Sequence, residues 1–290
     1  MATEQLHILG YKVANDRLVK LDGNAYEFNV FGSHAQNQRH YEAIGAAMTN
    51  LIVERMQREC GLVAARVPVD VSGSEPTSTV YHSQDALTSD KPLLLLVPGI
   101  SIDVGQWARK IIINESVSKG SMLTYIHRAH EAGYNVLVLN SNQNHVDNVP
   151  IRGNETPEEH VDYVWQHLVL PSTTNHVLAV AHSYGGVCMQ TLTDTRSDEI
   201  KSKKLIAIAL TDSVHRTGYP FGGSKKSGIS ELAHLAVNWI RSESPLGTGD
   251  GLDFSGVELR SAGTDQHDQT TVLAIDKVFE FLAERLSVAS

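Results

Sequence analysis

The stretch from Val177 to Gly186 constrains the fold of this chain more than any other part of the sequence. An apolar run, Val177 to Val180, predicts a buried strand, and Ala181-His182-Ser183-Tyr184-Gly185-Gly186 follows it directly. Small residues around a serine are typical of a sharp strand-to-helix turn, because larger side chains would collide with the neighbouring strand and helix. Such a nucleophile elbow exposes the serine hydroxyl. We therefore predict that Ser183 is a nucleophile, although Ala181 occupies the position of the first glycine of G-x-S-x-G.

A nucleophilic serine needs a base and an acid that orients the base, and after an elbow these follow in the order acid, then histidine. The run Lys204 to Leu210 predicts the next buried strand, and Asp212 comes just after it. The run Val257 to Ala262 predicts a later strand, which a loop containing His267 follows. Functional groups gather beyond the carboxyl ends of the strands in open α/β sheets. We therefore expect Asp212 and His267 to form a catalytic triad with Ser183.

Several neighbouring ionisable residues keep alternatives open. His215 follows Asp212 by three residues, so it could act as the base or lie beside the site. Asp265 or Asp268 could orient the base in place of Asp212, although a carboxylate there more commonly caps the following helix. We expect His182, His215 and Asp265 to lie close to the catalytic groups.

An oxyanion hole requires backbone N–H groups aimed at the developing negative charge. The residue after the nucleophile normally supplies one of them, which here is Tyr184. The apolar run Pro92 to Val97 predicts a strand that ends at Pro98-Gly99, so the second N–H would come from Ile100 or Ser101. The sequence does not choose between these two residues.

Composition and charge limit the possible partners. The chain has 290 residues, of which 41% are hydrophobic and 20% charged, as expected for one globular domain over residues 1–290. Its net charge of −9 disfavours direct binding to nucleic acid or to anionic membranes. No apolar run approaches the ~20 residues that cross a bilayer, and the N-terminus does not resemble a signal peptide. With only two, widely separated cysteines, we expect an intracellular protein, cytoplasmic or nuclear.

The rest of the chain alternates between helical and extended patterns. Strands are also expected over Val67–Val71, Thr77–Tyr81 and Val136–Leu139, and a glycine-rich loop over residues 218–228. Helices are expected over residues 36–58 and 121–132, from Thr156 to about Leu168, through Leu232, Ala236 and Trp239, and at the C-terminus. This alternation predicts an α/β fold, with a mostly parallel sheet covered by helices on both faces.

The 14 histidines do not form a recognisable metal motif. No H-E-x-x-H is present, and the pairs His127/His130 and His160/His167 lack a third ligand nearby in the sequence. We therefore expect neither a metal ion nor a cofactor.

Many ordered motifs resemble the Argonaute-binding (Arb-type) domain family, which includes animal cotranscriptional regulators. The resemblance covers nearly the whole chain and is carried by the following segments: Tyr26 to Gly32, Asn37 to Gly45, Gly105 to Arg109, Pro157 to His160, Ala181 to Gly186, Ala209 to His215, and Ser261 to His267. One departure lies after the third strand, where this chain has Pro98-Gly99 and relatives tend to have His-Gly. The resemblance implies an α/β-hydrolase fold and a triad of Ser183, Asp212 and His267.

Two functions are compatible with these observations. The first is a serine hydrolase that cleaves an ester, thioester or amide, on a small acyl substrate or an acylated peptide, through an acyl-serine intermediate. The second, which the resemblance implies, is a non-catalytic protein-binding module in Argonaute-dependent small-RNA silencing, heterochromatin or splicing regulation. Its partners would be Argonaute or chromatin proteins. Fold alone does not separate the two functions.

Overall fold

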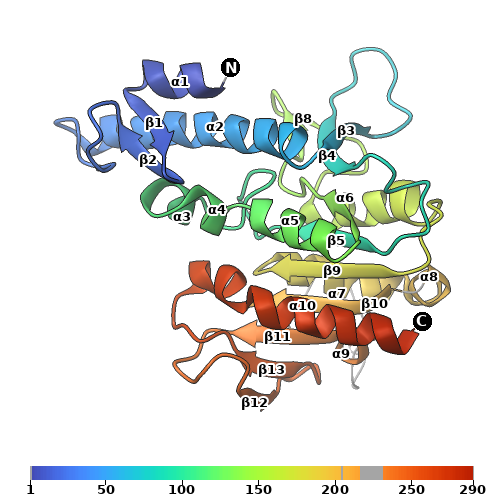
Figure 1. Cartoon of the computed structure of the whole chain (residues 1–290). Coiled ribbons are helices and arrows are strands. Elements are labelled where there is room, and N and C mark those ends of the chain that lie inside the picture. The colour runs from blue at the N-terminus through green and yellow to red at the C-terminus, as the bar shows by residue number, and fades with distance from the viewer. Residues whose placement is uncertain (1, 204, 216–230, 290) are drawn as a thin grey trace.

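One large sheet runs through the structure, and its central strands are parallel. In the computed structural model, which describes residues 2–203, 205–215 and 231–289, the strand order is β12-β13-β11-β10-β9-β5-β6-β4-β3 (Figure 1). The strands from β13 to β6 pair in parallel, whereas β12, β4 and β3 pair antiparallel at the two sides. The carboxyl ends of six neighbouring strands therefore lie along one edge of the sheet.

The strands of this sheet are β3 (Leu62–Val67), β4 (Ser78–Ser83), β5 (Leu93–Val97), β6 (Asn135–Val138), β9 (Val177–His182), β10 (Leu205–Thr211), β11 (Ala236–Ile240), β12 (Gly249–Leu252) and β13 (Glu258–Ser261). Two hairpins lie outside it, β1 (Tyr11–Ala14) with β2 (Arg17–Lys20), and β7 (His145–Val146) with β8 (Val149–Pro150).

The helices are α1 (Ala2–Ile8), α2 (His34–Arg58), α3 (Arg109–Asn114), α4 (Val117–Gly120), α5 (Leu123–Glu131), α6 (Pro157–Val164), α7 (Gly185–Thr195), α8 (Ser197–Lys203), α9 (Glu231–Leu235) and α10 (Thr270–Ala289). A π-helical turn over Trp165–Val169 continues α6, and a 3-10 turn over His267–Gln269 precedes α10. No helix in the described ranges is both long and apolar enough to cross a membrane.

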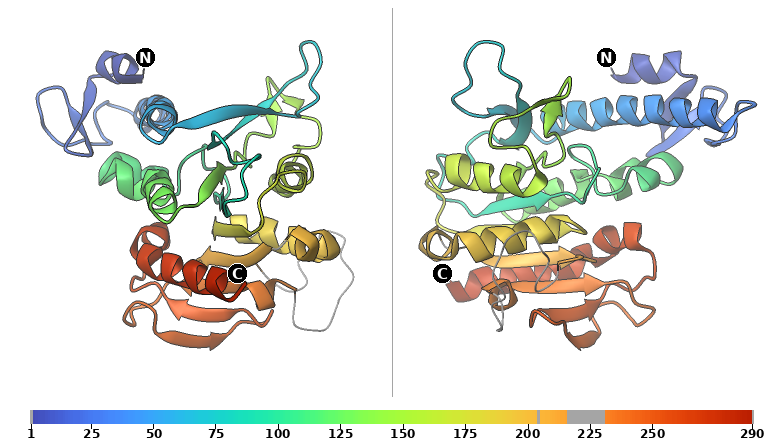
Figure 2. Two further views of the ribbon diagram at one scale, coloured as in Figure 1. Left: turned by 45° about the vertical axis from the view of Figure 1, so that its right-hand side comes forward. Right: turned by 180° about the vertical axis from the view of Figure 1, so that it is seen from behind.

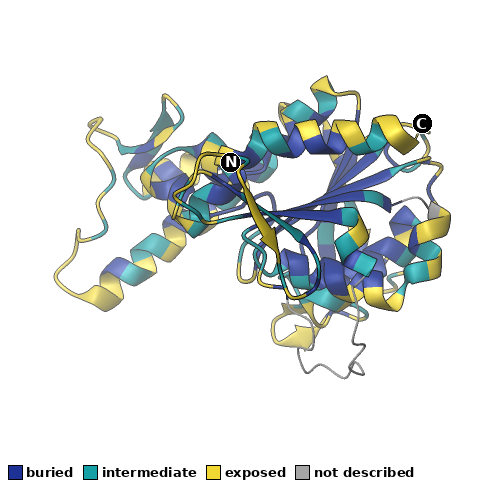
Figure 3. Ribbon diagram, turned by 90° about the horizontal axis from the view of Figure 1, so that it is seen from below, coloured by how far each residue is buried: buried dark blue, intermediate teal, exposed yellow. Residues whose placement is uncertain are grey.

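Helices cover both faces of the sheet, as the sequence predicts. Alternate residues of β5 enter separate cores, with Leu94 and Leu96 on one face and Leu93 and Leu95 on the other. Helices α2, α5 and α10 close the first core, and α6 and α7 close the second (Figure 2). Figure 3 shows the buried strands of the sheet between layers of helices, whose outer faces are exposed. Burial on both faces explains why the central strands are apolar throughout.

Two expectations from the sequence differ from the structure. Ala236 and Trp239 belong to strand β11, because the helix that includes Leu232 ends at Leu235. The run Val67–Val71 is not a strand, since β3 ends at Val67. The expected glycine-rich loop over residues 218–228 lies outside the described residues.

Helix α7 begins in close contact with the end of β5. A β-carbon at Gly185 would lie 2.7 Å from the backbone oxygens of both Val97 and Pro98. A β-carbon at Gly186 would collide with the Ser213 side chain, which follows β10. The two glycines therefore allow the helix to start directly against the sheet, and this packing fixes the turn that precedes it.

Replacing Gly185 with alanine is expected to lower the free energy of unfolding by about 2 to 3 kcal/mol, because the backbone of a central strand cannot move aside. Urea denaturation measures this change. Gly32→Ala is the matched control, since its added β-carbon has no atom within 4 Å and should change stability by about 0.5 kcal/mol or less. Equal stabilities of the two variants would contradict the close packing.

Candidate active site

Ser183 lies in the tight turn between β9 and α7. Its backbone is left-handed, with φ of 52°, which is uncommon for a residue with a side chain. The Ser183 N–H donates to Thr211 O at 3.0 Å, and Gly99 packs so close that its β-carbon would lie 3.2 Å from Ser183 Cβ. The turn is therefore held from both neighbouring strands, with Ser183 only partly buried.

Two more left-handed residues follow neighbouring strands at the same edge of the sheet. Ser101, after β5, has φ of 60°, and Asp212, directly after β10, has φ of 43°. Backbone strain of this kind costs about 1 to 3 kcal/mol per residue and is concentrated at functional sites. Its occurrence after β5, β9 and β10 marks this edge as the candidate site.

The carboxylate of Asp212 contacts the ring of His267 at this edge. His267 Nδ1 lies 2.6 Å from Asp212 Oδ2, a short contact typical of a charge-assisted hydrogen bond. Burial would raise the pKa of Asp212, but the hydrogen bonds from His267 and the Arg241 backbone, with the charge of Arg241, lower it overall. Asp212 is thus ionised at neutral pH, and it fixes the orientation of the imidazole.

Arg241 is a further partner of Asp212. Its Nε lies 2.7 Å from Asp212 Oδ2, and its backbone N–H donates to Asp212 Oδ1 at 3.3 Å. The sequence pattern does not single out Arg241, because the segment that precedes it is predicted to be helical. Had β11 been recognised as a strand, Arg241 would have stood at its carboxyl end, beside the acid.

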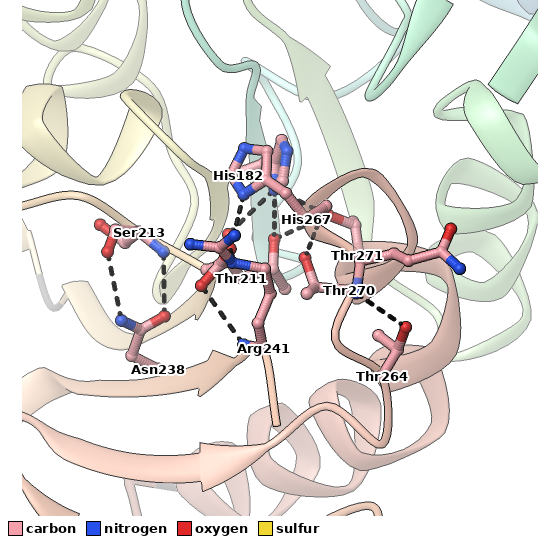
Figure 4. A network of polar contacts seen from close by, with 11 residues as sticks. His182, Thr211, Ser213, Asn238, Arg241, Thr264, His267, Thr270 and Thr271 are labelled. Atoms are coloured by element: carbon pink, nitrogen blue, oxygen red, sulfur yellow. Dashed lines mark hydrogen bonds and ion pairs between the residues drawn. The ribbon is translucent and has the colours of Figure 1, made fainter. Parts of the chain in front are cut away.

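His182 packs beneath the candidate base. Its ring centroid lies 4.6 Å from that of His267, and its Nδ1 lies 2.9 Å from Thr211 O and 3.1 Å from Thr271 Oγ1 (Figure 4). Because a carbonyl only accepts, Nδ1 carries the proton. Burial, together with the nearby His267, lowers the pKa of His182 to about 4. His182 is therefore a neutral side chain at neutral pH that supports one side of His267.

The loop after β5 is fixed by Asn142. The Asn142 side chain donates to the carbonyls of Gly99 and Ile102 at 2.8 Å, and it accepts from the Ser101 N–H at 3.0 Å. The Ser101 N–H is therefore already engaged, whereas the Ile100 N–H has no hydrogen bond to any described residue.

Tyr184 is held by the motif Pro157-Glu158-Glu159-His160. Its hydroxyl donates to Glu158 Oε1 at 2.5 Å. The buried His160 ring binds Asn154 Oδ1 at 2.8 Å and accepts from the Asn140 N–H at 3.2 Å, so it joins both ends of the loop before α6. Burial lowers the pKa of His160 to about 3, which keeps it neutral. This motif therefore supports the elbow from outside the site.

The other candidates do not join the Asp212 and His267 pair. His215 Nδ1 binds Ser213 Oγ at 2.7 Å, and its Nε2 lies 2.8 Å from Asp253 Oδ2. Although burial would raise the pKa of Asp253, its contacts with His215 and Ser255 lower it to about 2. Asp265 is exposed and makes no hydrogen bond to any described residue. Among the described residues, His215 and Asp265 therefore make no hydrogen bond to Asp212 or His267.

Two interactions are absent among the described residues, a serine-to-histidine hydrogen bond and a metal site. Ser183 Oγ has no hydrogen bond to the His267 ring within the part of the chain that the structure describes. Within the same part, no group of three or more His, Cys, Asp or Glu is placed to hold a metal ion.

Acidification should destabilise the protein in part through His182. In the unfolded state His182 has the usual histidine pKa of about 6.5, whereas in the folded state its pKa is about 4. Between these two pH values, protonation of His182 therefore favours the unfolded state. The stability that neutral His182 confers is complete above pH 6.5 and is lost progressively below it. Between pH 7.5 and 5.0 this loss amounts to about 2 kcal/mol, measurable by urea denaturation.

Between pH 7.5 and 5.0, the free energy of unfolding of His182→Gln should fall by about 2 kcal/mol less than that of the wild type. This difference does not depend on how stable the variant is at pH 7.5. The exposed His7→Gln is the control and should show the same fall as the wild type. A His182→Gln slope equal to that of the wild type would show that His182 is not held neutral.

Comparisons with known proteins agree with this architecture. Mouse (Mus musculus) and human proteins named "Cotranscriptional regulator ARB2A" are each 32% identical to this chain, over 305 and 304 residues, covering 87% of this chain and 72% of the relative. The histone deacetylase Clr3 is similar in structure, with a TM-score of 0.55 at 10% identity, over 87% of this chain and 44% of the Clr3 chain. At that identity the likeness to Clr3 concerns the fold alone.

The family resemblance expected from the sequence motifs is confirmed. The parallel sheet, the helices on both faces and the strand-turn-helix at Ser183 constitute an α/β-hydrolase fold. The model of the Arb2 domain matches residues 2–246. On the strength of this match and of the two relatives, the chain belongs to the Arb2 domain family.

Proposed function

We propose that this chain is a serine hydrolase that cleaves a carboxylic ester, thioester or amide. The observation that carries the proposal is the 2.6 Å contact between His267 Nδ1 and Asp212 Oδ2, at the sheet edge where the elbow presents Ser183. An acid and base coupled in this way leave the other imidazole nitrogen to act on a serine hydroxyl. The strained backbone of Ser183 also supports the proposal.

In the proposed reaction His267 removes the Ser183 proton as Oγ attacks the substrate carbonyl. The imidazolium is stabilised by Asp212, and it then protonates the leaving group as the tetrahedral intermediate collapses to an acyl-serine. Water, activated in turn by His267, releases the acid and restores Ser183. Because apo structures commonly lack the serine-to-histidine hydrogen bond, its absence is compatible with this sequence of steps.

The proposed oxyanion hole uses the backbone N–H groups of Tyr184 and Ile100. The Ile100 N–H is favoured over that of Ser101, because Asn142 already accepts from the latter. Gly99 supports this assignment, since its packing against Ser183 brings the β5 loop to the nucleophile.

For the substrate we propose a small acyl group or an acylated peptide. The loop between β6 and α6 carries only the short β7–β8 hairpin, whose residues are exposed. A hairpin of this size does not form the extended apolar cover that an interfacial lipase would need.

A second function is favoured by the relatives. The mouse and human proteins are named as cotranscriptional regulators, and that name points to regulation rather than to acyl transfer. We therefore also propose that the chain acts in the nucleus as a protein-binding module, with Argonaute or chromatin proteins as partners. The comparisons support this role more directly than they support catalysis, whereas the site geometry supports catalysis.

A fluorophosphonate probe, which reacts with activated serines, should label the wild-type protein. Ser183→Ala should abolish labelling because the nucleophile is missing, and His267→Ala should slow it at least about 100-fold because the base is lost. Gel fluorescence against time measures the rates.

Ser287→Ala on the exposed surface of α10 and exposed His234→Ala are the matched controls, and both should label like the wild type. Folding of each variant is checked by its thermal transition. A folded wild-type protein that resists the probe would refute the hydrolase proposal.

If the chain is chiefly a binding module, Ser183→Ala should retain its partners. Purification of tagged wild-type and Ser183→Ala proteins from nuclear extract, followed by mass spectrometry, should then recover the same Argonaute or chromatin proteins in equal amounts. Gly185→Ala, which disturbs the packing of α7, is expected to reduce that recovery. Absence of any such protein from the wild-type sample would count against this second function.

A further inference from the structure

One oxygen of Asp212 accepts two side-chain donors. Oδ2 lies 2.6 Å from His267 Nδ1 and 2.7 Å from Arg241 Nε, while Oδ1 accepts the Arg241 backbone N–H at 3.3 Å. A carboxylate held through both oxygens cannot rotate without breaking contacts, so Arg241 restricts the acid to the orientation that serves the imidazole.

The Asp212 and Arg241 side chains differ in how far they are exposed to solvent. The Asp212 side chain is 12% exposed, whereas that of Arg241 is 56% exposed. A surface ion pair normally contributes little to stability, and an arginine so exposed gains little by packing. The position of Arg241 on the acid itself therefore favours a role in the site over a role in folding.

We propose that Arg241 is a positioning residue that acts through Asp212, fixing its carboxylate and reducing the negative charge that His267 experiences. This role rests on the proposed hydrolase function. Without the guanidinium the acid would hold the protonated imidazole more strongly, and His267 would become neutral, and so able to act as a base, only at higher pH.

Other charged groups near the pair come from several elements. They are Arg241 after β11, Asp268 in the same turn as His267, and Glu115 at the end of α3, which accepts from Gln269; His182 on β9 also faces His267 but is neutral. Among them only Arg241 is a cation in contact with the acid. It is therefore the group whose removal should change the titration of His267 most directly.

The test compares wild type, Arg241→Met, Arg241→Lys and the control Arg260→Met. Arg260 also pairs with a carboxylate, Glu258, at 2.8 Å, and it stands one strand further along on β13. The imidazole resonances of His267, assigned with His267→Gln, are followed by NMR from pH 4 to 9. In parallel, the rate of fluorophosphonate labelling is measured over the same range.

In Arg241→Met both the titration midpoint of His267 and the midpoint of labelling should rise by about 0.5 to 1 pH unit, a shift that added salt reduces. The maximal labelling rate should fall about 10-fold because Asp212 Oδ2 loses the guanidinium and is held less firmly, although the backbone N–H of residue 241 remains. Arg241→Lys should restore the midpoint but only part of the rate, since an ammonium keeps the charge but does not reproduce the Nε–H contact with Asp212. Arg260→Met should match the wild type.

Midpoints and rates in Arg241→Met equal to those of a labelled wild type would overturn this inference and leave the hydrolase proposal intact. A wild type that does not label would overturn the hydrolase proposal instead, and the NMR midpoints would still decide whether Arg241 acts on the pair. An equal shift in Arg260→Met would reveal a general charge effect and would also overturn the inference.

Discussion

The candidate site depends on backbone approaching backbone at the start of α7. At Gly185 there is no space for a β-carbon against the end of β5, and at Gly186 none against Ser213. Gly99, which also follows β5, packs directly against the Ser183 side chain. The chain therefore turns within Ser183 and Tyr184 between β9 and α7, and the left-handed backbone of Ser183 is maintained by well-packed surroundings. Orientation of the serine is therefore a product of packing.

The sequence predicted the centre of the fold well because burial leaves a clear pattern there. Strands β5, β9 and β10 are continuous apolar runs, and the carboxyl-end rule correctly brought Asp212 and His267 together. The hydrophobic pattern did not predict β11. The spacing of Leu232, Ala236 and Trp239 fits one face of a helix as well as it fits a short helix followed by a strand. Because β11 was not predicted, the position of Arg241 at its carboxyl end was not predicted either. The hydrogen bond from the Ser101 N–H to the Asn142 side chain could not be predicted from a local pattern either, because it joins the loops that follow two different strands.

The candidate site combines a hydrogen-bonded Asp212 and His267 with side chains that support them and the elbow from further away. Two buried histidines, His182 and His160, remain neutral and serve as hydrogen-bonding supports, so only His267 of the three is placed to exchange protons at the sheet edge. The elbow is also tied to α6 through Tyr184 and Glu158. A partner that moved α6 would thereby move the residue after the serine. Regulation by binding and chemistry at Ser183 are thus mechanically compatible in one protein.

The acid and the base come from opposite sides of a boundary within the chain. The Arb2 match ends at residue 246, after Asp212 and Arg241 but before β13, His267 and α10. Helix α10 packs on the central sheet, and its Thr271 hydrogen-bonds His182 and Thr211 deep in the site. A truncated protein that stopped at the matched boundary would lose the imidazole and would expose the sheet face that α10 covers. For this chain, the segment that the Arb2 model matches contains Asp212 but not the His267 with which it pairs.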